Sequence, residues 1–219
     1  MKKNLKFVAY LVLALWISVA HAGSYEEFFR AVVEDNPKQV LGLLERGFDP
    51  NALDPKGRPG LFIAVQDGSL KVANVLADWP KTNVEWRSPK DESPLMVAAF
   101  KGDTDLVRKL IARGGDVNKP GWTPLHYAAT RAHLDVMQIL LDESAYIDAE
   151  SPNKTTPLMM AAYYGTPEAV KLLLDAGADP TLRNELGLSA IDFAQRGGRK
   201  DSAELIAAAI RSRQPKGKW

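Results

Sequence analysis

The chain has 219 residues, of which 46% are apolar and 25% charged, with a formal net charge of +1. These are ordinary values for a globular protein, and the balanced charge argues against nucleic-acid binding, which usually requires a basic excess. The sequence contains no cysteine, which excludes disulfides, thiol nucleophiles, thiolate zinc sites and iron–sulfur clusters. Only three histidines remain as general bases or imidazole ligands. The composition therefore disfavours an enzyme.

The N-terminal segment, residues 1–22, has the pattern of a secretory signal peptide. Lys2, Lys3 and Lys6 precede an apolar run over residues 7–20, and Ala20-His21-Ala22 follows. A positive segment, a short apolar stretch and an A-x-A site are typical of a peptide that is removed on export. The run would span about 21 Å as a helix, less than the roughly 30 Å hydrocarbon core of a membrane. We therefore expect cleavage after Ala22 and no stable membrane span afterwards.

Export predicts that the protein works in the periplasm. A cysteine-free chain suits an oxidising compartment, because it contains no thiols that could mispair. In a secreted eukaryotic protein, Asn153-Lys154-Thr155 would be a glycosylation sequon, but the short cysteine-free chain favours a bacterial origin. The alternative is a membrane-associated scaffold that keeps its N-terminal segment and uses the basic residues 211–219 against lipid.

Internal self-similarity accounts for most of the remaining sequence. The segments that align with one another begin at Leu61, Leu95, Leu125, Leu158 and Ile191, and a degenerate earlier copy begins at Phe28. In every copy, an alanine three places after the first apolar residue would allow two helices to approach closely. The copies recur at a nearly constant interval of roughly 33 residues, and self-similarity at such a period predicts a repeat protein.

Each copy has the pattern of a helix, a turn, a second helix and a loop. A glycine stands seven places after the start in four copies, where it can adopt the left-handed conformation that ends a helix. These glycines are Gly68, Gly102, Gly165 and Gly198. A second apolar stripe at helical spacing follows, and Asp or Asn residues mark the closing turn. One such unit cannot bury its apolar face alone, so we expect the copies to stack into a solenoid.

The repeats resemble those of the ankyrin family, whose signature is T-P-L-H-x-A. Residues 123–129 read TPLHYAA and match it in full, while residues 93–99 and 156–162 match all but the histidine. Residues 172–180, LLLDAGADP, fit the closing phrase of the family. The resemblance covers residues 24–210. It implies an all-α ankyrin-repeat solenoid of about six helix-turn-helix repeats joined by hairpin-like loops.

The expected domain organisation follows from these two patterns. We predict a signal peptide over residues 1–22, an ankyrin-repeat domain over 23–210 and a basic flexible tail over 211–219. The repeats are predicted to start near residues 24, 57, 91, 121, 154 and 187. The second and sixth copies lack the Thr-Pro pair, as expected of atypical repeats near the ends of a stack. The loop after the third repeat is short and the loop over residues 83–92 is long, so the loop edge should be uneven.

No arrangement of residues in the sequence indicates catalysis. The resemblance implies that His126 is structural and bonds both its own turn and the neighbouring repeat, and that His133, at the turn between two helices, is structural too. The sequence contains no nucleophile elbow, no P-loop and no dinucleotide-binding glycine motif. We therefore predict no catalytic residue, no cofactor and no metal. The alternative from another class is a metal-assisted hydrolase that uses carboxylates and His126.

The resemblance also implies where a partner would bind. In ankyrin proteins the variable contact residues occupy the loop tips and the fifth and sixth places after the leucine of the signature. In this sequence those positions, together with the long loop, hold several large aromatic and basic residues, which are common interface anchors. The predicted partner-binding residues are Trp86, Arg87, Phe100, Lys101, Trp122, Arg131, Tyr163 and Tyr164. Alternatively, some of these aromatic rings pack between adjacent loops.

The sequence therefore predicts a monomeric, non-enzymatic protein that binds one or more proteins on the concave loop edge of repeats two to five, with no nucleic-acid partner. Resemblance to exported ankyrin proteins implies two roles. One is an inhibitor or immunity protein that caps an exported hydrolase. The other is an accessory protein in periplasmic defence against peroxide stress. A neighbouring gene for a partner would favour the first role and a neighbouring catalase gene the second.

Overall fold

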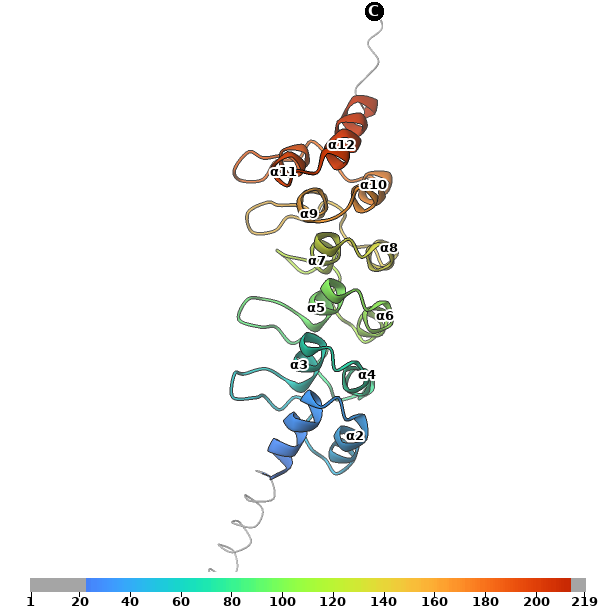
Figure 1. Ribbon diagram of the computed structural model, residues 1–219. Coiled ribbons are helices and arrows are strands. Elements are labelled where there is room, and N and C mark those ends of the chain that lie inside the picture. The colour runs from blue at the N-terminus through green and yellow to red at the C-terminus, as the bar shows by residue number, and fades with distance from the viewer. Residues whose placement is uncertain (1–22, 214–219) are drawn as a thin grey trace, which may run out of the picture. The chain divides into compact units, whose positions relative to one another are not determined.

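The computed structural model describes residues 23–213, which form two compact units, residues 23–86 and residues 87–213. The signal-peptide prediction and the last six residues of the predicted tail lie outside the described residues. Figure 1 shows helix after helix along the chain, and the predicted all-α class is confirmed. Within the described part, extended pairing is limited to two isolated bridges, Leu53 with Pro59 and Arg183 with Ser189. The boundary between the units falls in the long loop over residues 83–92.

The first unit contains the first two predicted repeats. Residues 23–33 are helical. The helices that follow are α2 (Pro37–Glu45), α3 (Gly60–Asp67) and α4 (Leu70–Asp78). The ring of Phe28 is fully buried and stacks on Phe48 with a centroid separation of 4.6 Å. A Cβ on Gly60 would lie 2.7 Å from the Phe28 ring. Glycine at that position therefore makes room for Phe28.

The second unit contains the four remaining repeats. Its helices are α5 (Pro94–Lys101), α6 (Thr104–Ala112), α7 (Pro124–Arg131), α8 (Leu134–Asp142), α9 (Pro157–Tyr164), α10 (Pro167–Asp175), α11 (Ala190–Arg196) and α12 (Lys200–Arg213). The helices α5, α7, α9 and α11 pack in one row, and α6, α8, α10 and α12 pack in a second row (Figure 1). Leu95, Leu125 and Leu158 lie at equivalent places in the first row and are fully buried. The repeat pattern therefore produced a continuous apolar core.

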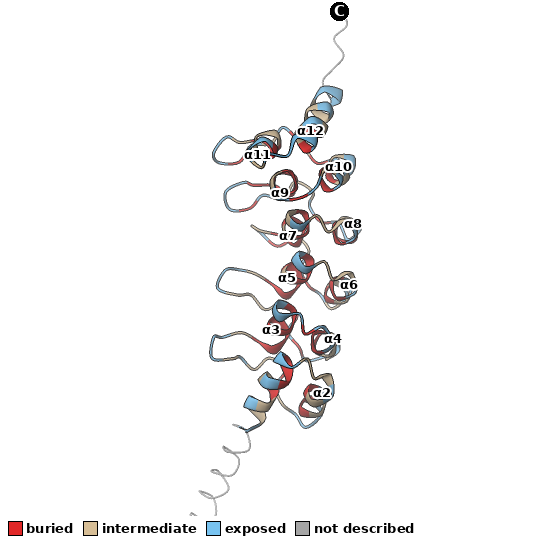
Figure 2. Cartoon of the chain, in the orientation of Figure 1, coloured by how far each residue is buried: buried red, intermediate tan, exposed pale blue. Residues whose placement is uncertain are grey.

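Close helix packing depends on the small residues that the pattern predicted. Ala98, Ala128 and Ala161 are completely inaccessible to solvent. In Figure 2 the buried residues of this unit line the facing sides of the two rows, and exposed residues occupy the outer turns and loop tips. A larger side chain at these alanines would push the rows apart, since protein interiors tolerate little added volume.

The first helices of the three middle repeats, α5, α7 and α9, each start with a proline turn. In α5 and α9 a proline occupies the first turn, where its missing N–H costs no hydrogen bond. The backbone N–H of Met96 donates to Ser93 Oγ at 3.2 Å, and that of Met159 donates to Thr156 Oγ1 at 3.4 Å. Such caps each contribute about 1 kcal/mol to helix stability. A serine or threonine followed by proline thus marks the start of these helices.

Three of the four glycines predicted to end helices do adopt the left-handed conformation. Gly68, Gly102 and Gly198 have φ values of +84°, +81° and +68°. The prediction for Gly165 is wrong, because its φ is −81°. A Cβ there would lie 2.8 Å from the carbonyl oxygens of Ala129 and Ala161. Glycine at 165 is required by the close approach of two backbone segments rather than by a positive φ.

The last helix, α12, continues to Arg213, beyond residue 210, where the repeat domain was predicted to end. The Arg213 guanidinium donates from Nη1 to the carbonyl of Ala178 at 2.7 Å and from Nη2 to that of Leu174 at 3.1 Å. These bonds anchor the end of α12 to the preceding repeat, so residues 211–213 are part of the helix rather than a tail.

Within residues 23–213, no helix combines the length and apolar character that a membrane crossing requires.

Candidate partner-binding site

The full-length loops before the first-row helices each fold around one polar side chain that accepts hydrogen bonds. In the loop before α11, Asn184 Oδ1 accepts from the backbone N–H groups of Leu186 and Leu188, both at 3.0 Å. Ser88 and Ser151 have the same role in the loops before α5 and α9. Each of these loops thus provides its own acceptor, and the loop before α11 is also held to the preceding loop, where the N–H of Glu185 donates to the carbonyl oxygen of Asn153 at 3.1 Å.

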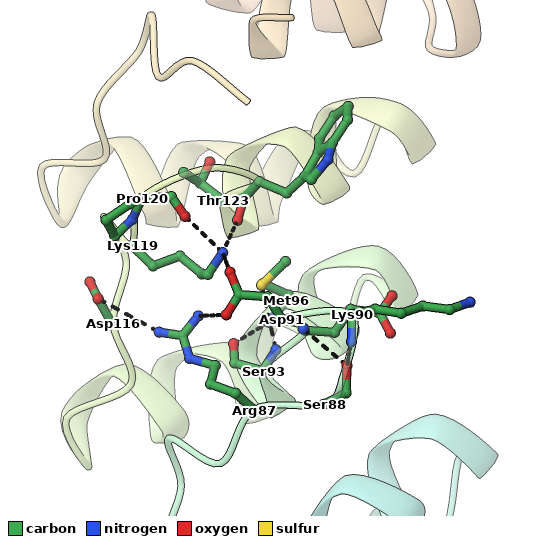
Figure 3. Close-up of polar contacts among 12 residues, drawn as sticks. Arg87, Ser88, Lys90, Asp91, Ser93, Met96, Asp116, Lys119, Pro120 and Thr123 are labelled. Atoms are coloured by element: carbon green, nitrogen blue, oxygen red, sulfur yellow. Dashed lines mark hydrogen bonds and ion pairs between the residues drawn. The ribbon is translucent and has the colours of Figure 1, made fainter. Parts of the chain in front are cut away.

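The loop before α7 is shorter and is organised by a cation instead. Lys119 occupies the position of the accepting residue, and its side chain is only 3% exposed. Its Nζ donates to the carbonyl oxygens of Pro120 and Trp122, both at 2.9 Å, and lies 2.5 Å from Asp91 Oδ2 (Figure 3). The three ammonium protons therefore all have acceptors. The shortened loop depends on the preceding loop, which supplies the counter-ion.

Arg87 belongs to the same network. Its Nη1 lies 3.9 Å from Asp91 Oδ1, its Nη2 lies 3.7 Å from Asp116 Oδ2, and its side chain is 26% exposed (Figure 3). Although the sequence predicted a partner contact for this arginine, its guanidinium links two loops of its own unit. Separations close to 4 Å at a partly exposed position contribute at most about 1 kcal/mol each.

Three of the predicted contact residues meet at an open hollow of about 290 Å³ in the second unit. Trp122, Tyr163 and Tyr164 line it, and they come from the short loop before α7 and from the end of α9. The sequence analysis missed two further apolar walls, Leu186 in the loop before α11 and Phe193 on α11. Both belong to the last repeat, which lies outside repeats two to five, where the partner was predicted to bind. The hollow thus lies at repeats four to six.

The aromatic rings around the hollow contact one another. The rings of Tyr163 and Tyr164 are 4.4 Å apart between centroids, and Tyr163 lies 6.3 Å from Phe193 in an edge-on arrangement. Tyr164 is nevertheless 54% exposed and Leu186 is 77% exposed. Large apolar side chains left in water beside a concave surface are the usual mark of a binding site.

The polar groups of the hollow are mostly used within the loops. Asn153 Oδ1 accepts from the Ser151 hydroxyl at 2.6 Å, and Asn184 Oδ1 accepts from the two N–H groups of its own loop. Arg196, at the end of α11, is the ionised side chain among the lining residues, and it is exposed. An incoming group would therefore meet aromatic walls and one cation.

Phe100 and Arg131 form a separate cluster that does not line this hollow. The Arg131 guanidinium carbon lies 5.1 Å from the centroid of the Phe100 ring, a cation–π geometry. Phe100 also meets Tyr127 at 6.1 Å, and the Tyr127 hydroxyl donates to Glu92 Oε1 at 3.1 Å. Burial, together with the charge of Glu92, raises the pKa of Tyr127. Lys101 is exposed beside this cluster.

Trp86 belongs to the first unit, where it packs on Phe62. The two rings are 4.8 Å apart between centroids, Phe62 is buried, and Trp86 is half-buried. The predicted contact residues therefore lie in four places: the hollow, the Phe100–Arg131 pair with Lys101 next to it, the loop network of Arg87, and this ring in the first unit. The structure brings only Trp122, Tyr163 and Tyr164 of the eight together at one concavity.

The structural role predicted for His126 is confirmed. Its ring is fully buried, and Nδ1 accepts from the backbone N–H of Thr123 at 3.1 Å. The proton therefore resides on Nε2, which donates to the carbonyl oxygen of Thr155 at 2.9 Å. Burial lowers the pKa of His126 to about 4. With both ring nitrogens engaged and no access to solvent, His126 has no geometry for the base of the alternative hydrolase.

His133 also supports the fold. Its Nε2 pairs with the carbonyl oxygen of Phe100 at 3.0 Å. A Cβ on Gly102 would lie 2.6 Å from the His133 ring, so the glycine at that position makes room for the imidazole. Among residues 23–213, no group of three or more histidine, aspartate or glutamate side chains is placed to hold a metal ion.

The fold and this loop edge define the class of protein, an all-α repeat protein with a concave apolar site. The family model described as "Ankyrin repeats (3 copies)" matches residues 28–120, 61–151, 95–184 and 145–213. The chain therefore belongs to the ankyrin-repeat family. Ankyrin repeats are protein–protein interaction modules, and this coarse function applies to the chain.

Two curated relatives illustrate the similarity. A putative ankyrin repeat-containing protein of Treponema pallidum is 28% identical over 182 residues, which cover 78% of this chain and 59% of that protein. The mouse protein "Ankyrin repeat and SAM domain-containing protein 6" is 37% identical over 119 residues, which cover 52% of this chain and 13% of that protein. The chain therefore spans less than two thirds of the length of either relative.

A solved structure matches the fold. It is the crystal structure of an ankyrin repeat domain from Acinetobacter baumannii, with a TM-score of 0.73 and 23% sequence identity. The match covers 84% of this chain and 97% of the other. At 23% identity, the similarity shows that the two chains share a fold.

Proposed function

We propose that this chain is a non-enzymatic module that holds a partner protein at the hollow between the loop tips and first-row helices of repeats four to six. The observation that carries the proposal is the exposure of Tyr164 and Leu186 beside Tyr163 and Phe193. Removing a side chain of this size from water contributes roughly 1.5–3 kcal/mol. Two or three such anchors suffice for a binding hot spot.

The location and role proposed for this module follow from the N-terminal pattern and from the family. A positive segment, an apolar run and an A-x-A site in residues 1–22 support export to the periplasm. In that compartment we propose an inhibitory contact, in which a loop of an exported hydrolase enters the hollow. An accessory role in peroxide defence is the alternative. Intact-mass measurement of the periplasmic protein tests export, since a processed chain would begin at Gly23.

The binding proposal is tested by comparing two double variants in a pull-down from periplasmic extract. In Tyr164→Ser/Leu186→Ser the exposed walls of the hollow are lost. In the control, Tyr146→Ser/Leu53→Ser, two comparably exposed side chains are lost that do not line it. We expect one protein to be retained by the native chain and the control and to be lost from the hollow variant. Equal capture by all three chains would contradict the proposal.

All four substituted side chains are at least 47% exposed. Surface substitutions of this kind usually change stability by less than about 0.5 kcal/mol each. Thermal unfolding of each variant checks this directly. A hollow variant that unfolds at the native temperature but captures nothing has lost a contact rather than its fold.

A further inference from the structure

On the basis of the proposed function, in which the hollow holds a partner protein, we propose that the partner segment presents an apolar side chain next to a side-chain carboxylate. The apolar side chain would enter between Tyr163, Leu186 and Phe193, and the carboxylate would pair with Arg196. The partner is therefore a protein with an exposed apolar–acidic pair rather than a basic or uncharged one.

The first argument concerns charge. Arg196 lies in the last turn of α11 and is the charged residue among those lining the hollow. Within the described part of the chain, its side chain makes no hydrogen bond or ion pair. Asp192, one turn earlier, accepts at Oδ2 from the Ser189 N–H at 2.7 Å and the Ser189 hydroxyl at 2.6 Å, and Arg183 Nη1 lies 3.7 Å from the same oxygen. The Ser189 hydrogen bonds and, through space, the charges of Arg183 and Arg196 lower the pKa of Asp192. Arg196 donates no hydrogen bond to this carboxylate, so its N–H groups can pair with an incoming one.

The second argument concerns the other polar groups. Asn153 and Asn184 use their side-chain oxygens to hold the loops, and the backbone N–H of Thr155 donates to Ser151 Oγ at 3.0 Å. Arg196 is the charged side chain among the lining residues, so a preference of the hollow for a charged partner depends on it. A guanidinium favours planar carboxylates, to which it can donate two parallel hydrogen bonds.

The third argument concerns size and shape. A volume of about 290 Å³ lies at the lower limit of small-molecule pockets, roughly 300–1,000 Å³. Such an open hollow accommodates a side chain or two of a protein segment. Its walls are largely aromatic, and aromatic rings prefer edge-on contacts with one another. A phenylalanine side chain is a suitable probe for this space.

The test uses three capped tetrapeptides and the full chain, followed by two-dimensional NMR of the amide groups. The first contains phenylalanine followed by glutamate between two glycines, the second replaces glutamate by glutamine, and the third replaces phenylalanine by alanine. We expect shifts at Tyr164, Leu186 and Phe193 with the first peptide and about three- to fivefold tighter binding than with the second, as one partly exposed charge pair would give. The third should bind more weakly still.

Two matched variants assign the charge preference. Arg196→Gln should abolish the difference between the glutamate and glutamine peptides while retaining the shifts at the apolar walls. Arg131→Gln carries the same change of charge, but its guanidinium lies over Phe100 outside the hollow, so it should keep the native preference. In Arg196→Glu, a peptide of phenylalanine followed by lysine should bind better than the glutamate peptide. This charge reversal would also show that the variant is folded.

Equal affinity of the native chain for the glutamate and glutamine peptides would overturn the carboxylate assignment. Shifts located away from the hollow, or no shifts with any peptide, would overturn the whole inference. The pull-down remains a separate measurement. If a partner is not captured by Tyr164→Ser/Leu186→Ser but is captured equally by the native chain and Arg196→Gln, the proposed function is supported and only the carboxylate inference is excluded.

Discussion

In the fourth repeat, Lys119 donates to two carbonyl oxygens of its own loop and His126 donates to a carbonyl of the next loop. In the fifth repeat, Ser151 and Met159 occupy the same two positions, and Ser151 accepts a hydrogen bond within its own loop. The backbone course is similar, but the fourth repeat depends on its neighbours on both sides. Asp91 of the third repeat supplies the counter-ion, and Thr155 of the fifth supplies the acceptor.

This difference shows what a shortened loop requires. With fewer residues in the loop, carbonyl oxygens face inward and need a donor, because an unpaired buried polar group is costly. An ammonium can donate three hydrogen bonds, but its charge then needs compensation. The fourth repeat is therefore joined to its neighbours by a buried cation and a buried imidazole, and the imidazole should make its stability respond to pH.

The largest expected effect is the pH dependence due to His126. Its pKa is about 4 in the folded chain against 6.5 for an ordinary histidine. Between these values the unfolded chain binds the proton and the folded chain does not. The stabilisation is therefore present above pH 6.5 and is lost as the pH falls towards 4. The loss amounts to about 3 kcal/mol, measurable by urea unfolding across this range.

His126→Met is the matched control, since methionine occupies the equivalent position in repeats three and five. It should lose about 1 kcal/mol at neutral pH with the bond to Thr155, but the steep decline between the two pKa values should be reduced. An unchanged pH profile in this variant would assign the decline to other groups.

The next effect is expected for Lys119→Met, which removes the buried cation. The carbonyl oxygens of Pro120 and Trp122 lose their donor, so the second unit should be destabilised by about 2 kcal/mol. Urea unfolding monitored by circular dichroism measures the change. In the control Lys90→Met, an exposed lysine of the neighbouring loop is replaced, and a change below about 0.5 kcal/mol is expected. Similar losses in both variants would show that Lys119 has no special role.

Asn184→Ala tests the other type of loop. The N–H groups of Leu186 and Leu188 would lose the hydrogen bonds that they donate to Asn184 Oδ1. The free energy of unfolding should therefore fall by about 1.5 kcal/mol. The same NMR spectra used for the peptides should show the largest changes at Leu186, because the loop tip loses its anchor. A variant with native stability and an unchanged Leu186 resonance would mean that the loop is held by other contacts.

The smallest predicted effect is a stabilisation. Asp148 accepts a hydrogen bond from the Asp179 N–H at 3.0 Å. Burial raises the pKa of Asp148, and repulsion from the Asp179 carboxylate raises it further. Asn118 stands at the equivalent place one repeat earlier in the stack, where its Oδ1 accepts from the backbone N–H of Tyr146 and its Nδ2 donates to the carbonyl oxygen of Ser144. Asp148→Asn should therefore raise stability at neutral pH by about 0.5 kcal/mol.

Two further observations test the assignment of Asp148. A carboxyl with a raised folded pKa becomes less destabilising as the pH falls, so the advantage of Asp148→Asn should shrink in acid. Glu150→Gln removes the same charge from an exposed neighbour and should leave stability nearly unchanged. Equal gains from both substitutions would indicate a general charge effect.

Much of the fold could be predicted from short-range pattern. The match of residues 123–129, TPLHYAA, to the ankyrin signature implied that His126 is structural, and the apolar spacing within each copy implied the helix–turn–helix unit. The bond from His126 to Thr155, 29 residues away, depends on the stacking of two repeats. The glycine pattern was less reliable. Gly165 has the same place in its repeat as Gly102, yet it is needed for the approach of two backbones distant in sequence, which no local pattern encodes.

The candidate site was predictable only in part. The family resemblance placed Trp122, Tyr163 and Tyr164 at variable positions, and the structure gathers them at one hollow. Leu186 and Phe193 were missed because the binding edge was predicted to end at the fifth repeat, although a leucine at a loop tip is a signal that could have been noticed. The partner contact predicted for Arg87 stays a prediction, and the structure adds two ion pairs within the unit, with Asp91 of the same loop and with Asp116 of the next.

The sequence by itself determined the period, the helix starts and the apolar faces, because these depend on residues close together in the chain. The tertiary structure alone decided which exposed rings share a concavity and which charges are already paired, because those contacts join loops of different repeats. Two examples are Arg196, which lines the hollow together with residues of the preceding repeats, and Lys119, which forms an ion pair with Asp91 of the preceding loop.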